Sequence, residues 1–532
     1  MGHPKILLTR RGILRAGAWS IGAGLAPALI GCVAPGPQWR QNPFSLGIAS
    51  GDPVPDGFVL WTRLAPDPLS ADPATPGGMT GGAVPVAYEI AADPQMLDIR
   101  RRGTVFALPE DAWSVHVEIG GLPAGRPYWY RFSAGSAQSS IGKTMTAPAA
   151  NAALPRMRFG FVSCANYEVG YFSAYRHLTD EQPDIVVFLG DYIYENFGRR
   201  PGVRRHSDGV VASDLRTYRN RYAQYRTDAD LQRLHATVPA LMTWDDHEVQ
   251  NDYADDLSET FDDPATFLKR RAAAYRAFYE HMPVRPSLSH PDGPTMRVYD
   301  RFAFGDLIEF SVLDGRQYRS SQACYAKPNH GGGHAETDAS CPERRDGARS
   351  MLGMAQETWL FDGLAASRAK WNVIAQDVLM ADLRERQPDG TIGYWTDDWN
   401  GYPACRARLM QHIHDARVRN AVVIGGDNHA FWANDLKLDV NDQRSPTVAT
   451  EFVGTSITSF GSNFEAYSSW LPDNPHVHFY DSRKRGYALV DVAPERMNVA
   501  MRVISDAADP NATLSTLRNF VVENGRAGPI EA

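Results

Sequence analysis

The hydrophobic pattern of this chain changes once, near residue 150, and this change constrains the fold more than any other feature. Residues 44–148 read as short strands that alternate apolar and polar positions, with turns rich in Pro, Gly and Asp between them. Residues 156–505 instead alternate strand-like runs, such as DIVVFLGD, with segments of helical period, such as GYFSAYRHLTDEQ. A strand-only region followed by strand–helix alternation predicts a β-sandwich and then a layered α/β domain.

Two local patterns extend this prediction. The segment GLPAGRPYWYRF is similar to the corner before a late strand of a fibronectin-like or Ig-like sandwich, with Tyr128 as the corner tyrosine. The segment LSTLRNFVVENG near the end of the chain has the spacing of a short amphipathic helix. We therefore expect residues 506–532 to form a helical tail outside the α/β domain.

The first 32 residues are typical of a targeting segment. Arg10 and Arg11 precede a moderately apolar run that is too short and too rich in glycine to span a bilayer comfortably. Twin arginines indicate the bacterial route that exports folded proteins. The run ends in LIGC, which resembles a lipoprotein cleavage box with Cys32 as the acylated residue; a chance match is the alternative. We expect a twin-arginine signal peptide over 1–32, a proline-rich tether over 33–43, and a mature protein in the periplasm, the cell envelope or the extracellular space.

Composition narrows the partners that the protein can have. The chain of 532 residues carries a formal net charge of -8 and no basic stripe, which argues against a protein that binds a nucleic-acid backbone. Cys324 and Cys341 flank a polar, glycine-rich loop and can close it as a disulfide in an oxidising compartment. We expect a monomer.

Several strand ends in the second region carry polar residues in the same way, in the segments GFVSCANY, VFLGDYIYE, LMTWDDHEVQND and VIGGDNHAFW. In layered α/β sheets, functional groups collect at the carboxyl ends of the strands. These segments contribute a thiol, a phenol, carboxylates and imidazoles, a mixture that predicts a metal site with more than one ion. The residues are Cys164, Asp191, Tyr194, Asp245, Asp246, His247, Asn251, Asp427, Asn428 and His429.

The softness of these donors divides them into two sets. Cys164, Tyr194 and His429 suit a transition metal, and a thiolate with a phenolate favours ferric iron. The carboxylates of Asp246 and Asp427, with Asn251 as a further candidate, are hard oxygen donors that suit Ca²⁺. Asp191 would bridge the two ions, and His247 is a candidate catalytic acid near the substrate rather than a ligand.

The spacing of these residues resembles the calcineurin-like metallophosphoesterases, and in particular the alkaline phosphatase D family, whose relatives include an iron-dependent phospholipase D. The superfamily pattern is Asp, Gly-Asp-x-x-Tyr, Gly-Asn-His-Glu and Gly-His-x-His. Here Cys164, Asp246 and Asp427 replace its first Asp, its Asn and the first His of its last motif. The same departures mark the alkaline phosphatase D branch, and the segments FSLGIASGDPVPDGFVLWTRL, LDGRQYR and EFVGTSITS also match it.

The resemblance implies a four-layer α/β/β/α catalytic domain and a mixed iron–calcium centre. It implies Fe³⁺ at Cys164, Asp191, Tyr194 and His429, and Ca²⁺ at Asp191, Asp246 and Asp427. Around this centre, Asp245 is expected to contact the metal ligands without binding a metal itself. Asn251 is a weaker candidate for substrate binding, and Arg316 is either a phosphate clamp or the partner of Asp314 in an ion pair.

These expectations converge on an exported phosphatase that hydrolyses phosphomonoesters, and also phosphodiesters, with hydroxide held by the metals as the nucleophile. Asp191 and His247 are the expected catalytic residues. One alternative is a phosphodiesterase or phospholipase D that acts on phospholipids or cell-wall polymers, because the metal ligands are the same and pocket loops decide the substrate. An alternative of another class is an envelope binding protein with an inactive catalytic domain.

Overall fold

The computed structural model describes residues 37–70, 72, 74–198, 202–325 and 331–532. The predicted signal peptide, with Arg10, Arg11 and Cys32, lies outside the described residues, as does the first part of the tether. Among the described residues, no helix has the length and apolar character needed to cross a membrane.

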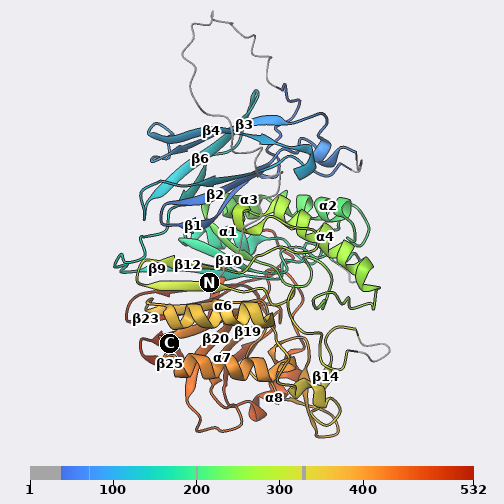
Figure 1. Cartoon of the computed structure of the whole chain (residues 1–532), viewed down its shortest axis with the longest axis vertical. Helices are drawn as coiled ribbons and strands as arrows, with labels where there is room; N and C mark the ends of the chain where they lie inside the picture. The colour runs from blue at the N-terminus through green and yellow to red at the C-terminus, as the bar shows by residue number, and fades with distance from the viewer. Residues whose placement is uncertain (1–36, 71, 73, 199–201, 326–330) are drawn as a thin grey trace, which may run out of the picture. The chain divides into compact units, whose positions relative to one another are not determined.

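The larger sheet runs through both predicted regions of the chain (Figure 1). Its central strands β9, β10 and β11 are parallel, and β1 pairs in parallel with β11 at Gly51 and Ala240. Strands from the N-terminal region therefore extend the sheet of the α/β region. In spatial order the strands are β25 (Arg526–Glu531), β24 (Leu514–Glu523), β23 (Arg496–Ile504), β22 (Arg485–Val492), β9 (Met157–Val162), β10 (Ile185–Leu189), β11 (Ala240–Thr243), β1 (Ile48–Val54), β2 (Gly57–Arg63) and β5 (Ser114–Ile119).

A second mixed sheet supplies the other half of the α/β region. Its inner strands β13, β15, β18 and β20 are parallel neighbours. In spatial order the strands are β12 (Asp300–Phe304), β13 (Ile308–Val312), β15 (Trp371–Ala375), β18 (Ala421–Gly425), β20 (Thr447–Val453), β19 (Phe431–Lys437) and β21 (Val477–Asp481). The short strands β14 (Ala335–Glu336), β17 (Ile392–Trp395) and β16 (Glu385–Arg386) form a separate small sheet.

Alternating side chains bury both faces of the central strands. In β10, Val186 and Phe188 pack with the helices, whereas Ile185, Val187 and Leu189 pack with the second sheet. Successive side chains of a strand point to opposite faces, so a strand buried on both sides reads as the continuous apolar run seen in the sequence. The helices on this face are α1 (Ser173–Asp180), α2 (Leu215–Arg226), α3 (Ala229–Thr237) and α4 (Pro264–His281).

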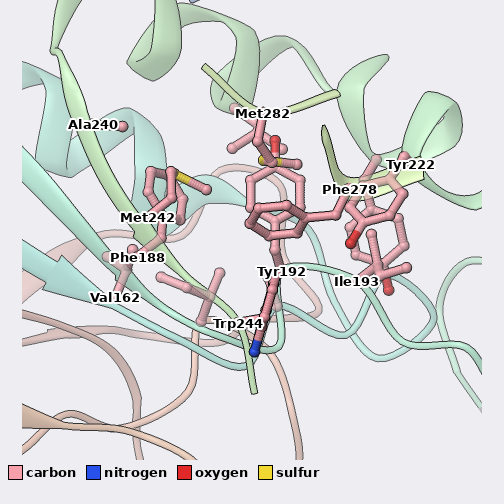
Figure 2. Packing of buried hydrophobic residues seen from close by; sticks show 14 of the residues in the cluster. Val162, Phe188, Tyr192, Ile193, Tyr222, Ala240, Met242, Trp244, Phe278 and Met282 are labelled. Carbon is pink, nitrogen blue, oxygen red and sulfur yellow. The ribbon is translucent and has the colours of Figure 1, made fainter. Parts of the chain in front are cut away.

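Figure 2 shows part of the core between these helices and the larger sheet, to which Tyr192, Trp244 and Phe278 contribute. The rings of Trp244 and Phe278 pack edge to face, with centroids 5.3 Å apart. The indole of Trp244 stacks on Tyr275 of α4, with ring centroids 4.3 Å apart. On the far face of the second sheet, a third cluster packs α6 (Gly353–Ala366) and α7 (Pro403–Asp415) against β15 and β18.

The N-terminal region packs two sheets face to face. Side chains of β2 and β5 meet those of β3 (Val84–Ala91) and β6 (Pro127–Ala134) in one core, and β4 (Ile99–Ala107), β7 (Ala137–Gln138) and β8 (Gly142–Met145) complete the second of these sheets. The hydroxyl of Tyr128 donates to the carbonyl of Pro123 at 3.3 Å, the contact that a corner tyrosine makes. Cys324 and Cys341, which the sequence left as able to pair, form a disulfide, and their Cα atoms are 6.0 Å apart.

The predicted helical tail is wrong. Residues 514–531 form the antiparallel strands β24 and β25, which continue the larger sheet beyond residue 505. Asn524 and Gly525 turn the chain between Glu523 and Arg526, and Gly525 has a φ of +81°. An Asn-Gly pair between strand-forming residues is a hairpin signal, and it competes with the helical spacing of the preceding apolar residues.

Phe520 fixes this hairpin to the core, so Phe520→Ala should lower the free energy of unfolding by about 3–5 kcal/mol. The ring is buried and lies 6.0 Å from Phe452 and 5.8 Å from Phe479, measured between centroids. Denaturant unfolding would measure the loss. Glu523→Ala, an exposed change on the same strand, should alter stability by no more than about 0.5 kcal/mol. Equal stability of the two variants would contradict a structural role for the hairpin.

Candidate metal centre

Strand ends from both sheets meet at the predicted site. Cys164 follows β9, Asp191 follows β10 and Asp246 follows β11, while Asp427 and His429 follow β18 of the other sheet. Cys164, Asp191, Asp427 and His429 have φ values of 60°, 52°, 57° and 55°, so each turns the chain through the left-handed region. Such strained backbone collects at functional sites, where the surrounding structure holds it in place.

The predicted iron ligands lie together. One ligand atom each from Cys164, Asp191 and His429 falls within 4.8 Å of the others. The Tyr194 hydroxyl is 2.7 Å from Asp191 Oδ2 and 3.1 Å from His429 Nε2, so the phenol joins the same group. His429 Nδ1 donates to the carbonyl of Phe460 at 2.8 Å, which leaves Nε2 as the lone-pair nitrogen.

A second group of ligand atoms shares Asp191 and contains Asp246 and His247. Asp246 Oδ2 accepts from the backbone N–H of Asp252 at 2.7 Å, whereas its buried Oδ1 has no hydrogen-bond partner among the described residues. A buried carboxylate oxygen left in this way suits a cation. Asp427 does not belong to any such group within the described part of the chain, although it follows β18 beside His429.

Burial raises the pKa values of most acidic donors, and this tests whether the site fits a metal. Asp246 is the exception among them: burial raises its pKa as well, but the charges of His247 and Arg316 outweigh burial and hold it below the usual range. Burial raises the pKa of the Cys164 thiol and of the Tyr194 phenol well above the ordinary values, and the neighbouring Asp191 raises both further. Burial also raises the pKa of Asp191 well above its usual range, and that of Asp427 to about 7. These side chains must lose their protons to bind a metal. A bound cation would supply the positive charge that favours their deprotonated forms, so the residues fit a metal ion.

Glu248 holds the ends of two strands in register, a role that the sequence prediction did not include. Its carboxylate accepts the backbone N–H groups of Asp191 at 3.1 Å, Tyr192 at 2.6 Å and Asp245 at 2.9 Å. Gly190 lets β10 approach this close, because a Cβ there would lie 2.4 Å from the backbone nitrogen of Asp245. One buried carboxylate thus fixes the backbone that carries the shared ligand Asp191.

Arg316 does not occupy the position predicted for a phosphate clamp. Its side chain has no exposed surface, and its guanidinium contacts Asp397 at 2.7 Å and Asp245 at 2.5 Å. The predicted partner Asp314 accepts the backbone N–H of Arg316 instead, at 3.0 Å. Arg316 therefore neutralises buried carboxylates beneath the site, and Asp245 lies there with it.

His247 pairs with Glu195, a residue that the sequence prediction missed. His247 Nδ1 donates to Glu195 Oε2 at 2.6 Å, and the imidazole lies against the ring of Tyr194 at a centroid distance of 4.1 Å. Burial lowers the pKa of His247, but Glu195, Asp246 and Asp191 outweigh it and raise the pKa well above the ordinary value. Glu195 directly follows Tyr194 in the chain, and that adjacency was the signal available.

A cavity of about 350 Å³ opens over these residues. Asn251, the weaker candidate for substrate binding, lines it, and the backbone N–H of Asn251 donates to Glu195 Oε1 at 3.2 Å. The side chains around the cavity are mostly polar, and they include the catalytic candidate His247 and the predicted iron ligands Tyr194 and His429. The lining residues are Asn166, Glu168, Val169, Tyr194, Asn196, His247, Asn251, Asn428, His429, Ser459, Phe460, Gly461 and Ser462.

Comparisons with known proteins agree with this arrangement. Residues 159–501 match the model of the PhoD-like phosphatases, and residues 31–148 match the model of the PhoD-like phosphatase N-terminal domain. The chain is 44% identical over 500 residues to alkaline phosphatase D of Bacillus subtilis (strain 168), covering 92% of this chain and 83% of that protein. It is also similar to a solved structure described as the structure of PhoD, with a TM-score of 0.87, 43% identity and 93% of each chain covered.

The donor cluster and these matches define an enzyme that hydrolyses phosphoric esters. The chain belongs to the PhoD-like phosphatase family. The resemblance to the alkaline phosphatase D family that its motifs predicted is confirmed. The family and the intact donor set argue against an inactive binding protein.

Proposed function

We propose that this phosphatase uses a mixed iron–calcium centre and hydrolyses both phosphomonoesters and phosphodiesters. The observation that carries the proposal is that Asp191 belongs to two adjacent groups of ligand atoms. One group contains the thiol of Cys164 and the imidazole of His429, donors that suit iron; the other contains the carboxylate of Asp246. Asp427, which follows β18, would complete the calcium site.

The two ions would supply Lewis acidity for the phosphoryl group and its attacking water, as two-metal sites do for in-line displacement. The protein supplies the rest. Glu248 fixes the backbone of Asp191, and the hydrogen bond from His429 Nδ1 to the Phe460 carbonyl fixes that imidazole. His247, held by Glu195 at the cavity, is positioned to protonate the leaving oxygen.

We also propose export by the twin-arginine route, to the periplasm or the cell envelope, with lipidation of Cys32 as an option. The Arg10–Arg11 pair and the Cys324–Cys341 disulfide support an oxidising compartment. Export in the folded state suits a monomer that loads its metals first. The packing of α1–α4, the two sheets and α6–α7 suits the α/β/β/α layering of metallophosphoesterases, and the Tyr128 contact suits an Ig-like N-terminal sandwich.

The test compares hydrolysis of p-nitrophenyl phosphate and bis-p-nitrophenyl phosphate by protein exported through its own leader. Elemental analysis should find iron and calcium, and prior chelation should abolish both activities. The ratio of the two rates decides between a phosphomonoesterase and a diesterase that prefers phospholipids or cell-wall polymers. Full activity in protein shown to lack iron would contradict the proposed centre.

Glu195→Gln should lower kcat for p-nitrophenyl phosphate by about 10- to 100-fold, the cost found at metal sites when the hydrogen-bond partner of a histidine is removed. The amide keeps the shape of the side chain but removes the carboxylate that orients and charges His247. KM and iron content should stay close to those of the unaltered enzyme, because Glu195 is outside both groups of ligand atoms. A variant that loses iron along with activity would show that Glu195 supports the metal and not His247.

A further inference from the structure

A second cavity lies directly beside the one over the metal centre. Its volume is about 390 Å³, similar to the first, and the two share part of their walls. The shared residues are Val169, Ser459, Phe460, Gly461 and Ser462. Loop 459–462 therefore forms a ridge, with the metal centre on one side and the second cavity on the other.

The structure holds this ridge in place from both sides. On the metal side, the Ser459 hydroxyl donates to the Tyr194 oxygen at 2.6 Å. On the other side, the Ser482 hydroxyl donates to the carbonyl of Ser462 at 2.8 Å, and Arg485 donates to the carbonyl of Ser459 at 2.6 Å. A Cβ at Gly461 would lie 1.9 Å from the carbonyl oxygen of Ser482, so only glycine fits there. Phe460 lies on the ridge with 44% of its surface exposed.

Cations outnumber carboxylates in the second cavity. Arg483, Lys484 and Arg485 line it, and Asp506 is the one carboxylate among its described lining residues. Arg483 is paired with Asp481 at 2.6 Å. Arg485 donates to backbone carbonyls and to the Ser456 hydroxyl, and the exposed Lys484 has no carboxylate within ion-pair distance among the residues that the structure describes. The cavity thus presents positive charge that the protein does not itself neutralise.

Lys484 also lies close to a predicted iron ligand. The hydroxyl of Thr455 is 2.7 Å from the carbonyl oxygen of Lys484 and 3.3 Å from that of His429. The neighbouring Arg485 donates to the same His429 carbonyl at 3.1 Å. The backbone that carries Lys484 is therefore tied to the backbone that carries the ligand, and a lysine side chain is long enough to reach a group beside the metal centre.

We propose that the second cavity is a subsite for an anionic group on the ester arm that a phosphodiester substrate carries beyond its scissile bond, and that Lys484 is its principal contact. The scissile phosphate would lie over the metal centre while the arm crosses the ridge at Phe460. This inference rests on the proposed diesterase activity. It assigns the enzyme to diesters with a second, covalently attached negative charge, such as a phosphate or sulfonate one short linker away.

The experiment uses two diesters that differ only at the end of one arm, p-nitrophenyl 3-sulfopropyl phosphate and p-nitrophenyl butyl phosphate. The sulfonate cannot be hydrolysed, so released p-nitrophenol reports the same reaction in both. We expect kcat/KM of the metal-loaded enzyme to be about three- to tenfold higher for the sulfopropyl diester, as one charged contact provides. Lys484→Gln should remove this preference. Lys143→Gln, an exposed lysine of β8, should keep it.

Other outcomes would overturn the inference. Equal kcat/KM values for the two diesters would show that the cavity does not bind the anionic group of the arm. A preference that survives in Lys484→Gln would show that Lys484 is not its contact. Faster turnover of the butyl diester on addition of free propane-1-sulfonate would assign the cavity to a separate anion instead. If neither diester is hydrolysed while p-nitrophenyl phosphate is, the diesterase activity fails, and the subsite fails with it.

Discussion

Replacing Asp191 with asparagine should reduce kcat/KM for phosphoester hydrolysis by at least about 10³-fold, because one side chain serves two groups of ligand atoms. Asparagine has nearly the same shape but carries no charge. The loss would therefore remove a negative ligand from both ions at once. The measurement is steady-state hydrolysis of p-nitrophenyl phosphate together with iron and calcium analysis, and both metals should decline.

The fold should survive this substitution. The backbone N–H of Asp191 donates to Glu248 and does not depend on the aspartate side chain, and an amide oxygen can still accept from Tyr194. Thermal unfolding of the variant without metals should match that of the metal-free parent. Asp442→Asn, a half-exposed aspartate that pairs with Arg444 at 3.6 Å, is the matched control and should keep full activity. Activity within tenfold of the parent in Asp191→Asn would remove the shared ligand from the mechanism.

The strand ends were the predictable part of the site. A buried parallel strand is recognised in a sequence by its continuous apolar run. The residue after the run lies at the carboxyl edge of the sheet. Cys164, Asp191 and Asp246 follow neighbouring parallel strands, so their proximity follows from the order β9, β10, β11. His429 comes from the other sheet. No local pattern states that two sheets meet along one edge. The polar strand end VIGGDNHAFW and the softness of an imidazole donor nevertheless included His429 in the predicted site, and the family resemblance agreed.

Contacts between distant segments could not be read from the sequence. Arg316 pairs with Asp245 and Asp397, which are 71 and 81 residues away, so its burial depends on how three loops come together. Glu195 reaches His247 across 52 residues in the same way. From the sequence alone, only residues close along the chain can be proposed as partners, and Asp314 is the carboxylate nearest to Arg316. Buried charges are held by whichever opposite charge the fold brings close, and that choice is made by topology.

The tail and α4 show a different limit, because here the local signals existed. Asn524-Gly525 marks a hairpin, yet the apolar spacing before it also fits a helix, and the tertiary packing of Phe520 decides between them. In α4, Asp263 accepts from the backbone N–H of Thr266 and Pro264 occupies the first turn, both ordinary signs of a helix start. The sequence analysis does not predict helix α4, although the chain carries these signals.

Cys164→Ser should remove most of the iron and at least about 10²-fold of the activity, more than is lost when a hydrogen-bond partner of a ligand is removed. The thiol is 1% exposed, and burial together with Asp191 and Asp427 raises its pKa well above the ordinary value. In this environment only a bound cation would make a thiolate stable. A serine hydroxyl is harder and far less acidic, so it would stay protonated and bind ferric iron weakly.

The chain contains its own control for this prediction. Cys405 is also a free, buried thiol, but it donates to Glu357 at 3.1 Å and belongs to none of the ligand groups among the described residues. Cys405→Ser should keep iron and activity, while Cys164→Ser should lose both, together with any visible absorption that arises from a thiolate bound to iron. Two variants with the same iron content would make Cys164 a packing residue. The departure from the superfamily pattern at this position would then have no role in metal choice, and the argument from donor softness to iron would rest on Tyr194 and His429 alone.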